Sequence, residues 1–241
     1  MSNMHKMKIE IWSDVACPFC YIGKHRFETA LNQFPESEHI EVEWKNFMLN
    51  PGLKTNPNLS ITEYLSKEKG IPAAQIKNMN LRVVEMAREM GLNLNIDNIV
   101  VANTFMAHNL IQYAATRGKQ NMAEELLFES YFTHGHNVDN IEVLLQLAAK
   151  MGFDPTEVKQ VLENKTYTQQ VHSDVNEARK LGISGVPFFL FNRSFAISGA
   201  QSVETFVNAL RKSFAEWRSK NPISEVEVTE GLSCNVDGEC N

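Results

Sequence analysis

The segment DVACPFCYIG, residues 14–23, contains two cysteines separated by a proline and a phenylalanine. The residues around its start, KIEIWSDVA, alternate and are rich in β-forming side chains, which predicts a strand that ends near Asp14. Pro18 suits the first position of a helix, and apolar residues at helical spacing follow it as far as Pro35. Cys17 is therefore expected at the amino-terminal end of a helix that directly follows a strand.

Further strands are predicted on both sides of the middle of the chain. In HIEVEWKNFML, Ile40 and Trp44 belong to an alternating pattern, so a second strand follows the first helix. A strand, a helix and a strand with short links form a βαβ unit, whose two strands are parallel. Near the carboxyl end, GVPFFLFN and RSFAISG predict two short strands joined by a tight turn at Asn192 and Arg193, and Ser202 caps a closing amphipathic helix. This order of elements indicates an α/β fold.

The long segment from residue 54 to residue 181 lacks strand-like alternation and predicts an inserted helical domain. Capping-box spacings at Ser60, Asp139 and Asp154 predict the starts of three helices. Glycines that follow apolar runs predict helix ends at Gly70, Gly91, Gly118, Gly152 and Gly182. The α/β domain is thus expected in two parts, residues 1–53 and 182–220, and residues 221–241 are expected to form a mobile tail.

The composition excludes several classes of protein. The chain has 241 residues, of which 43% are hydrophobic, so a normal core can form. Its net charge of −6 lacks the basic excess that binding to nucleic acid requires. Nothing in the chain approaches the roughly 20 apolar residues that span a bilayer, so no membrane partner is expected. The first residues lack the apolar core of a signal peptide, and a cytoplasmic localisation is expected.

The four cysteines are Cys17, Cys20, Cys234 and Cys240. A reducing cytosol disfavours permanent structural disulfides. A structural zinc ion needs about four ligands, commonly from two pairs with two to four residues between their members. Because five residues separate Cys234 from Cys240, the chain does not match this spacing, and no metal is expected. A redox pair is the preferred interpretation of Cys17 and Cys20.

The positions of the first two cysteines predict different roles. At the start of a helix, unpaired backbone amides and the positive end of the helix dipole favour the thiolate of Cys17. Cys20 lies one turn further on the same face and is expected to be shielded as a thiol. Cys17 would attack a substrate disulfide, and Cys20 would then displace the product from the mixed disulfide, which requires that solvent can reach Cys17. Asp14 has two interpretations, a proton carrier for Cys20 or a residue that stabilises the turn.

Other polar residues near the motif also have alternative interpretations. His108 could face the redox centre or be a buried histidine at the domain interface. Lys24 and His25 are expected on a solvated face of the first helix. Cys234 and Cys240 could be free thiols, a local disulfide, or a relay that exchanges with the first pair; the turn-forming NVDG between them favours a pair able to form a disulfide.

The arrangement resembles a thioredoxin fold of the DsbA type, in particular its FrnE-like branch. The resemblance is carried by SDVACPFCYIGK and by GISGVPFFLFNRSFAISGAQ, residues 182–201, with support from NTFMAHNLIQYA, residues 103–114. It implies a βαβ and ββα thioredoxin fold with a central mixed sheet and a helical insertion. It also implies that Val186 and Pro187 are joined by a cis peptide bond that faces the redox pair, leaving the backbone of Val186 free to bind an extended substrate.

The resemblance implies a thiol-disulfide oxidoreductase that acts on protein disulfides. The residues expected at its site are the catalytic Cys17 and Cys20 and the substrate-binding Pro18, Phe19, Val186 and Pro187. The expected partners are protein disulfides or dithiols, with glutathione or a thioredoxin-type protein as reductant, and no bound cofactor. The DsbA type usually has a histidine where this chain has Phe19, which cannot donate a hydrogen bond, so a reductase or isomerase is expected in preference to a strong oxidase.

Two other functions are open to this sequence. Kappa-type glutathione transferases and 2-hydroxychromene-2-carboxylate isomerases are similar in fold, but they usually have serine at the position of Cys17 and lack the second cysteine. A binding module that uses a cleft of the helical domain, with the cysteines as incidental redox sensors, is the third alternative. The presence of both Cys17 and Cys20 favours redox chemistry.

Overall fold

The computed structural model describes residues 6–222. The terminal pair, Cys234 and Cys240, and nearly all of the predicted tail lie outside the described residues. Within residues 6–222, no helix has both the length and the apolar composition that crossing a membrane requires.

The centre of the molecule is a four-stranded mixed sheet with the order β2-β1-β3-β4. The strands are β1 (Met7–Ser13), β2 (Ile40–Asn46), β3 (Phe188–Phe191) and β4 (Phe195–Ser198). β1 pairs in parallel with β2, as the βαβ pattern predicts, and antiparallel with β3, which pairs antiparallel with β4. Asn192 and Arg193 both have positive φ in the turn between β3 and β4. The predicted α/β thioredoxin fold is confirmed.

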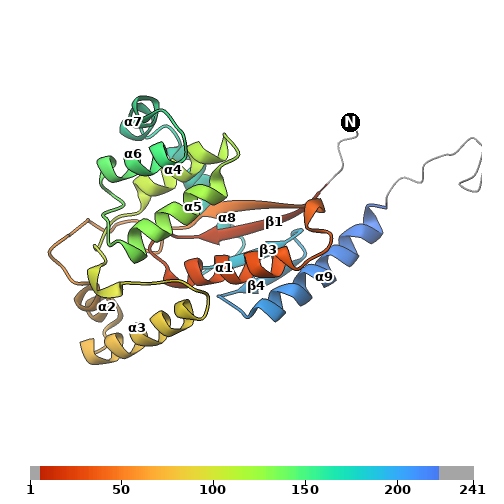
Figure 1. Ribbon diagram of the computed structural model, residues 1–241, viewed down its shortest axis with the longest axis horizontal. Coiled ribbons are helices and arrows are strands. Elements are labelled where there is room, and N and C mark those ends of the chain that lie inside the picture. Colours follow the sequence, from red (N-terminus) through yellow and green to blue (C-terminus); the bar gives the residue numbers. More distant parts are fainter. Residues whose placement is uncertain (1–5, 223–241) are drawn as a thin grey trace, which may run out of the picture.

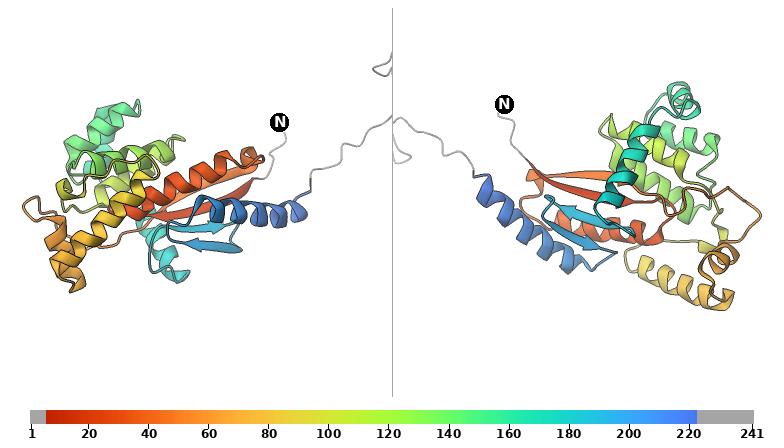
Figure 2. Two further views of the ribbon diagram at one scale, coloured as in Figure 1. Left: turned by 60° about the horizontal axis from the view of Figure 1, so that its bottom comes forward. Right: turned by 180° about the vertical axis from the view of Figure 1, so that it is seen from behind.

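Helices cover both faces of this sheet. On one face, α1 (Pro18–Asn32) and α9 (Val203–Lys220) pack on Ile9 and Ile11 of β1, together with Phe27 and Phe206 (Figure 1). On the other face lies α8 (Thr168–Lys180), whose backbone at Asp174 accepts a hydrogen bond from the indole of the fully buried Trp12 (Figure 2). Because successive side chains of a strand point to opposite faces, β1 contributes to both cores. Each fully buried large side chain contributes about 1.5–3 kcal/mol.

The remaining helices lie mostly beyond the end of the sheet toward which β1 points (Figure 1). They are α2 (Ile61–Lys69), α3 (Ala73–Arg88), α4 (Phe105–Ala115), α5 (Gln120–Phe128), α6 (Ile141–Lys150) and α7 (Pro155–Glu163), with short helical turns at Ile96–Asn98 and Glu129–Thr133. Their apolar faces form one core that also includes Cys17 and Cys20. The helical segment and the redox motif are therefore packed together.

Most of the predicted helix boundaries are confirmed, and one is wrong by a residue. Ser60 forms a complete capping box with Glu63, and the side chain of Asp154 caps α7. α6 is capped by Asn140, whose side chain accepts a hydrogen bond from the amide of Glu142 at 2.9 Å, and not by Asp139. The carboxylate of Asp139 instead accepts a hydrogen bond from the hydroxyl of Thr55 at 2.6 Å, a contact across 84 residues. The glycines predicted to end helices all have positive φ: Gly70, Gly91, Gly118, Gly152 and Gly182.

Candidate active site

The two cysteines lie at the start of α1, as predicted. Cys17 is the N-cap residue, with φ −99° and ψ 110°, and Pro18 takes the first helical position. The amide of Cys17 donates to the carbonyl of Asp14 at 2.9 Å, so the turn after β1 sets the position of the cysteine. Both cysteines are free thiols, and the amide of Cys20 donates to the carbonyl of Cys17 at 3.0 Å.

Access to the two sulfurs differs, but less than the sequence predicts. Cys20 is fully buried, whereas Cys17 keeps 4% of its surface exposed. The thiol of Cys17 donates to the carbonyl of Val186, with 3.5 Å between sulfur and oxygen, and this contact helps to cover it. The side chain of Phe19, two residues after Cys17, is 41% exposed. A substrate must therefore displace neighbouring groups before it contacts the sulfur of Cys17.

Cys20 is held in its protonated form. Burial raises the pKa of the Cys20 thiol well above its usual value, because the thiolate loses its hydration. The hydrogen bond and the charge interaction with Cys17 raise this pKa further, while the backbone of Asp14 and the hydroxyl of Ser13 lower it. Cys20 thus needs a proton acceptor before it can attack.

The loop before β3 lies against both the redox pair and α1. Val186 and Pro187 are joined by a cis peptide bond, as the resemblance implied. The carbonyl of Pro187 accepts a hydrogen bond from the amide of Gly199 at 2.8 Å, which ties the loop to the end of β4. The ring of Pro187 packs on α1 at Gly23, where a Cβ atom would come within 3.0 Å of the proline Cγ. Gly23 thus allows the loop to approach the helix.

Replacing Gly23 with alanine should destabilise the protein by up to about 2 kcal/mol, because overpacking costs about 1–3 kcal/mol and alanine regains roughly 1 kcal/mol over glycine in a helix. Urea unfolding measures the change. Gly52→Ala is the control, since a Cβ at Gly52 would meet nothing nearer than 3.8 Å. A Gly23→Ala protein more stable than the wild type would contradict the tight contact with Pro187.

Asp14 is the centre of a buried hydrogen-bond network behind the motif. Its carboxylate, in a residue only 1% exposed, accepts from the amide of Leu49 at 2.7 Å and from that of Ala16 at 3.3 Å. The imidazole of His108 lies 3.3 Å from the same carboxylate and 2.9 Å from the amide oxygen of Asn46. These contacts describe a residue that stabilises the turn, and His108 is both buried at the domain interface and linked to the redox loop.

Comparison with known proteins agrees with this geometry. The model of the DsbA-like thioredoxin domain matches residues 8–211. This chain belongs to the DsbA-like thioredoxin family.

Solved structures of other proteins share the fold of this DsbA-like protein. A probable DsbA oxidoreductase from Streptomyces coelicolor is 32% identical, with a TM-score of 0.81 and 98% of each chain covered. A 2-hydroxychromene-2-carboxylate isomerase is 13% identical, with a TM-score of 0.63 over 89% of this chain and 98% of the isomerase. The cytosolic disulfide reductase DsbM from Pseudomonas aeruginosa, solved with GSH, is 14% identical, with a TM-score of 0.60 over 90% of this chain and all of the reductase. The last two show a shared fold.

The prediction that Lys24 lies on a solvated face of the DsbA-like helix α1 is wrong. Lys24 is only 2% exposed, because α5 of the helical segment covers this side of α1. Its ammonium group lies 2.9 Å from the carboxylate of Glu28 and 2.6 Å from that of Glu125. His25, predicted on the same face, is half-buried and contacts Glu125 at 3.1 Å. The hydroxyl of Tyr21 also donates to Glu125, at 3.1 Å.

Glu125 is strongly held in its ionised form by this cluster. Burial raises its pKa, but the hydrogen bond and charge of His25 and those of Lys24 outweigh burial and lower the pKa to about 2. The carboxylate therefore clamps α5 of the DsbA-like protein to its redox helix.

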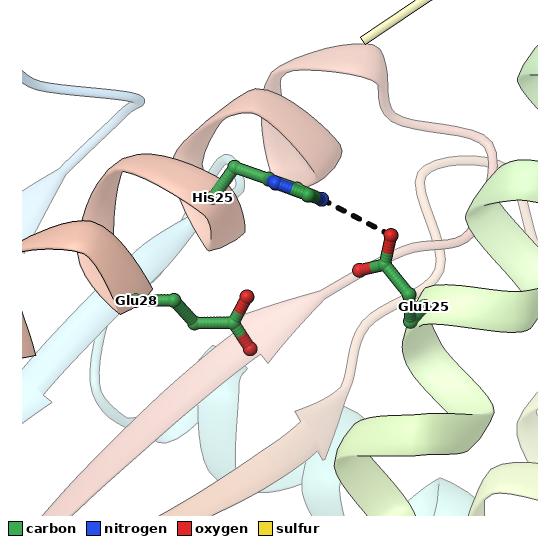
Figure 3. A group of neighbouring side chains, drawn as sticks. All are labelled: His25, Glu28 and Glu125. Atoms are coloured by element: carbon green, nitrogen blue, oxygen red, sulfur yellow. Dashed lines mark hydrogen bonds and ion pairs between the residues drawn. The ribbon is translucent and has the colours of Figure 1, made fainter. Parts of the chain in front are cut away.

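Three residues of this cluster have the chemistry of metal ligands. One ligand atom each from His25, Glu28 and Glu125 lies within 4.8 Å of the others (Figure 3). The ammonium group of Lys24 already contacts the carboxylates of both Glu28 and Glu125, so this side chain balances their charge. The contacts describe an ion-pair clamp.

Ser13 and Glu124 are two residues near the redox pair that sequence reasoning missed. Both are buried, and Ser13 is the last residue of β1. The sequence does indicate that Glu124 is buried, because it lies four residues before the buried Phe128 and so falls on the apolar face of α5. An acidic residue on a buried face is unusual unless it is paired or functional.

Proposed function

We propose that this protein is a thiol-disulfide oxidoreductase that exchanges disulfides with protein substrates through Cys17 and Cys20, as a reductase or isomerase. The observation that carries the proposal is the pair itself, with Cys17 at a helix start and Cys20 buried as a thiol one turn later. Membership of the DsbA-like family supports it. The likeness in fold to a cytosolic disulfide reductase is consistent with action in the cytoplasm.

The exchange proceeds in two steps. The thiolate of Cys17 attacks one sulfur of a substrate disulfide; that S–S bond breaks, and the other substrate sulfur leaves with the electron pair and takes a proton from solvent. Cys20 then loses its proton and attacks the sulfur of Cys17, which releases the second substrate thiolate. The substrate gains two electrons, and Cys17 and Cys20 form a disulfide. Glutathione or a thioredoxin-type protein restores the dithiol.

The surface beside Cys17 supports a protein substrate. Phe19 and Leu49 are large apolar side chains that are 41% and 53% exposed, and the backbone of Leu49 contacts the redox loop through Asp14. A peptide that packs on Phe19 and Pro18 would reach the backbone of Val186 and the ring of Pro187. Its backbone would replace the thiol of Cys17 as the partner of the Val186 carbonyl, which frees the sulfur to react.

Reduction of insulin tests the proposal. With dithiothreitol as reductant, the wild type should accelerate the precipitation of insulin B chains well above the uncatalysed rate. The same protein should show no conjugation of glutathione to 1-chloro-2,4-dinitrobenzene and no isomerisation of 2-hydroxychromene-2-carboxylate. Activity in either of these assays without insulin reduction would contradict the proposal and favour a glutathione-dependent enzyme.

A further inference from the structure

β2 is an edge strand of the sheet, and its free side borders a groove. The strand order β2-β1-β3-β4 leaves one side of β2 without a neighbouring strand (Figure 1). A groove of about 630 Å³ is lined by residues 41–45 of this strand, by the end of α4, by the start of α5 and by α8. Its volume lies within the roughly 300–1,000 Å³ that is typical of binding pockets.

A side chain already pairs with the free edge of β2 as a neighbouring strand would. The side-chain amide of Gln120 accepts a hydrogen bond from the backbone amide of Trp44 at 3.1 Å and donates one to the carbonyl of Trp44 at 2.8 Å. The backbone amide of Asn46 donates to the carboxylate of Asp174 at 3.0 Å. These contacts show that the backbone groups of Trp44 and the amide of Asn46 point away from β1.

Val42 presents its backbone to the same side. Because the backbone groups of alternate residues point to opposite edges of a strand, the amide and carbonyl of Val42 point the same way as those of Trp44. The hydrogen bonds formed among residues 6–222 include none to these two groups of Val42, which also lines the groove. An extended peptide in the groove would therefore find a free donor and a free acceptor on β2, the arrangement that β-augmentation uses.

The charges of the groove indicate which peptide suits it. Its lining contains three carboxylates, from Glu41, Glu43 and Asp174, and one ammonium group, from Lys45. Lys45 and Lys8 both contact Glu43, and Lys45 lies 3.5 Å from Asp174. Glu41 is exposed and forms no ion pair with the described residues. A basic side chain would pair with Glu41, whereas an acidic one would be repelled.

The other polar side chains of the groove suit a peptide backbone. They are amides and a hydroxyl, which can donate and accept hydrogen bonds: Gln112, Gln120, Asn121, Gln170 and Ser173. The amides and carbonyls of an extended peptide alternate along its edges, so groups of both kinds are needed beside it. Gln120 shows this use on the backbone of Trp44.

We propose that the groove beside β2 binds an extended, lysine- or arginine-containing segment of a partner protein, which pairs with the backbone of Val42. The proposal goes beyond the proposed function, because binding in the groove uses neither cysteine of the redox pair. The carboxyl-terminal segment of this chain, residues 223–241, is not the expected occupant. It contains no lysine or arginine, and it is acidic at Glu225, Glu227, Glu230, Asp237 and Glu239.

Fluorescence anisotropy with a labelled peptide tests the proposal. The probe is the fluorescein-labelled heptapeptide Thr-Lys-Val-Lys-Val-Lys-Thr. The wild type should bind it at least tenfold more tightly than the matching peptide with glutamate in place of lysine. A version in which proline replaces both valines cannot form a continuous strand and should bind at least fivefold less tightly.

Two variants of the protein test the two parts of the site. Val42→Pro removes the outward amide without removing a hydrogen bond to β1, and edge strands tolerate proline at such positions. Glu41→Arg reverses the charge of the exposed carboxylate. Each variant should bind the lysine peptide at least fivefold less tightly than the wild type. Circular dichroism checks the fold; if Val42→Pro does not fold, Glu41→Arg and the proline peptide decide.

Glu85→Arg is the matched control, because Glu85 is exposed on α3, which does not line the groove. It makes the same change in net charge as Glu41→Arg and should leave the affinity unchanged. Hydrogen–deuterium exchange followed by mass spectrometry locates the peptide on the protein. Exchange within β2 should slow when the lysine peptide is bound.

Equal affinity of the wild type for the lysine and glutamate peptides would overturn the proposal. Wild-type affinity in folded Val42→Pro or in Glu41→Arg would also overturn it, as would an equal loss in Glu85→Arg, which would show attraction by net charge alone. A dimer in sedimentation that dissociates in Val42→Pro would assign this edge to a second copy of the chain instead. None of these measurements involves a disulfide, so a failure to reduce insulin would reject the proposed function alone.

Discussion

Replacing Cys17 with serine should abolish the reduction of disulfides by this protein. A hydroxyl is far less acidic and less nucleophilic than a thiol, and loss of a nucleophile of this kind costs more than about 1000-fold in rate. Insulin reduction at equal protein concentration measures the loss, and circular dichroism checks the fold. The side chain of Cys17 makes no capping hydrogen bond to α1, so serine should leave the helix intact.

Cys20→Ser is the matched variant, with the same substitution three residues further along the helix. It should react once with a disulfide and then stop, because the second step lacks its nucleophile. Mass spectrometry under non-reducing conditions should find a stable adduct on Cys17 in Cys20→Ser and none on Cys20 in Cys17→Ser. An adduct on the fully buried Cys20 would reverse the assignment of the two roles.

Replacing Lys24 with methionine should destabilise the protein by about 3 kcal/mol, near the low end of the range for breaking a buried ion pair. The low end applies because the side chains of Glu28 and Glu125 are 29% and 34% exposed, so water compensates part of the loss. Urea unfolding at about pH 7 measures the change. Lys159→Met is the control: Lys159 is 51% exposed, pairs with Glu163 at 3.9 Å, and should contribute less than about 0.5 kcal/mol. Equal losses in the two variants would contradict the clamp.

The same cluster should make stability fall in acid. The pKa of Glu125 is lowered from 4.5 to about 2, so its contribution is complete above pH 4.5 and is lost as the pH falls toward 2. In Lys24→Met, one of the cations that stabilise the ionised Glu125 is removed. The free energy of unfolding should therefore decline less steeply between pH 4.5 and 2. Urea unfolding of both proteins across the range measures this difference.

Much of the fold could be predicted because its signals are local. The alternation around Ile40 and Trp44, the proline after Cys17 and the capping side chain of Ser60 each act within a few residues of the structure they specify. The cis bond before Pro187 was predicted from the resemblance, since an X–Pro bond alone favours the trans form. Asn140 caps α6 in place of Asp139, because the carboxylate of Asp139 accepts a hydrogen bond from Thr55. This contact between distant residues leaves no local pattern in the sequence.

The candidate site was predicted only where it is local. The sequence placed Cys17 and Cys20 at the start of α1, but the carbonyl of Val186, 169 residues away, covers the first sulfur and leaves 4% of Cys17 exposed. Asp14 was considered as a proton carrier because it is near in sequence. The burial of Glu124 was missed because it depends on how α5 packs in the folded chain.

The sequence by itself determined the order of the strands and helices and the position of the cysteine pair at a helix start, because periodicity, caps and proline geometry depend on neighbouring residues. Tertiary structure alone decided which charges are buried. Lys24 and Glu125 are 101 residues apart in the chain and 2.6 Å apart in space. Burial and ionisation depend on what packs against a group, and here that partner comes from a distant segment of the chain.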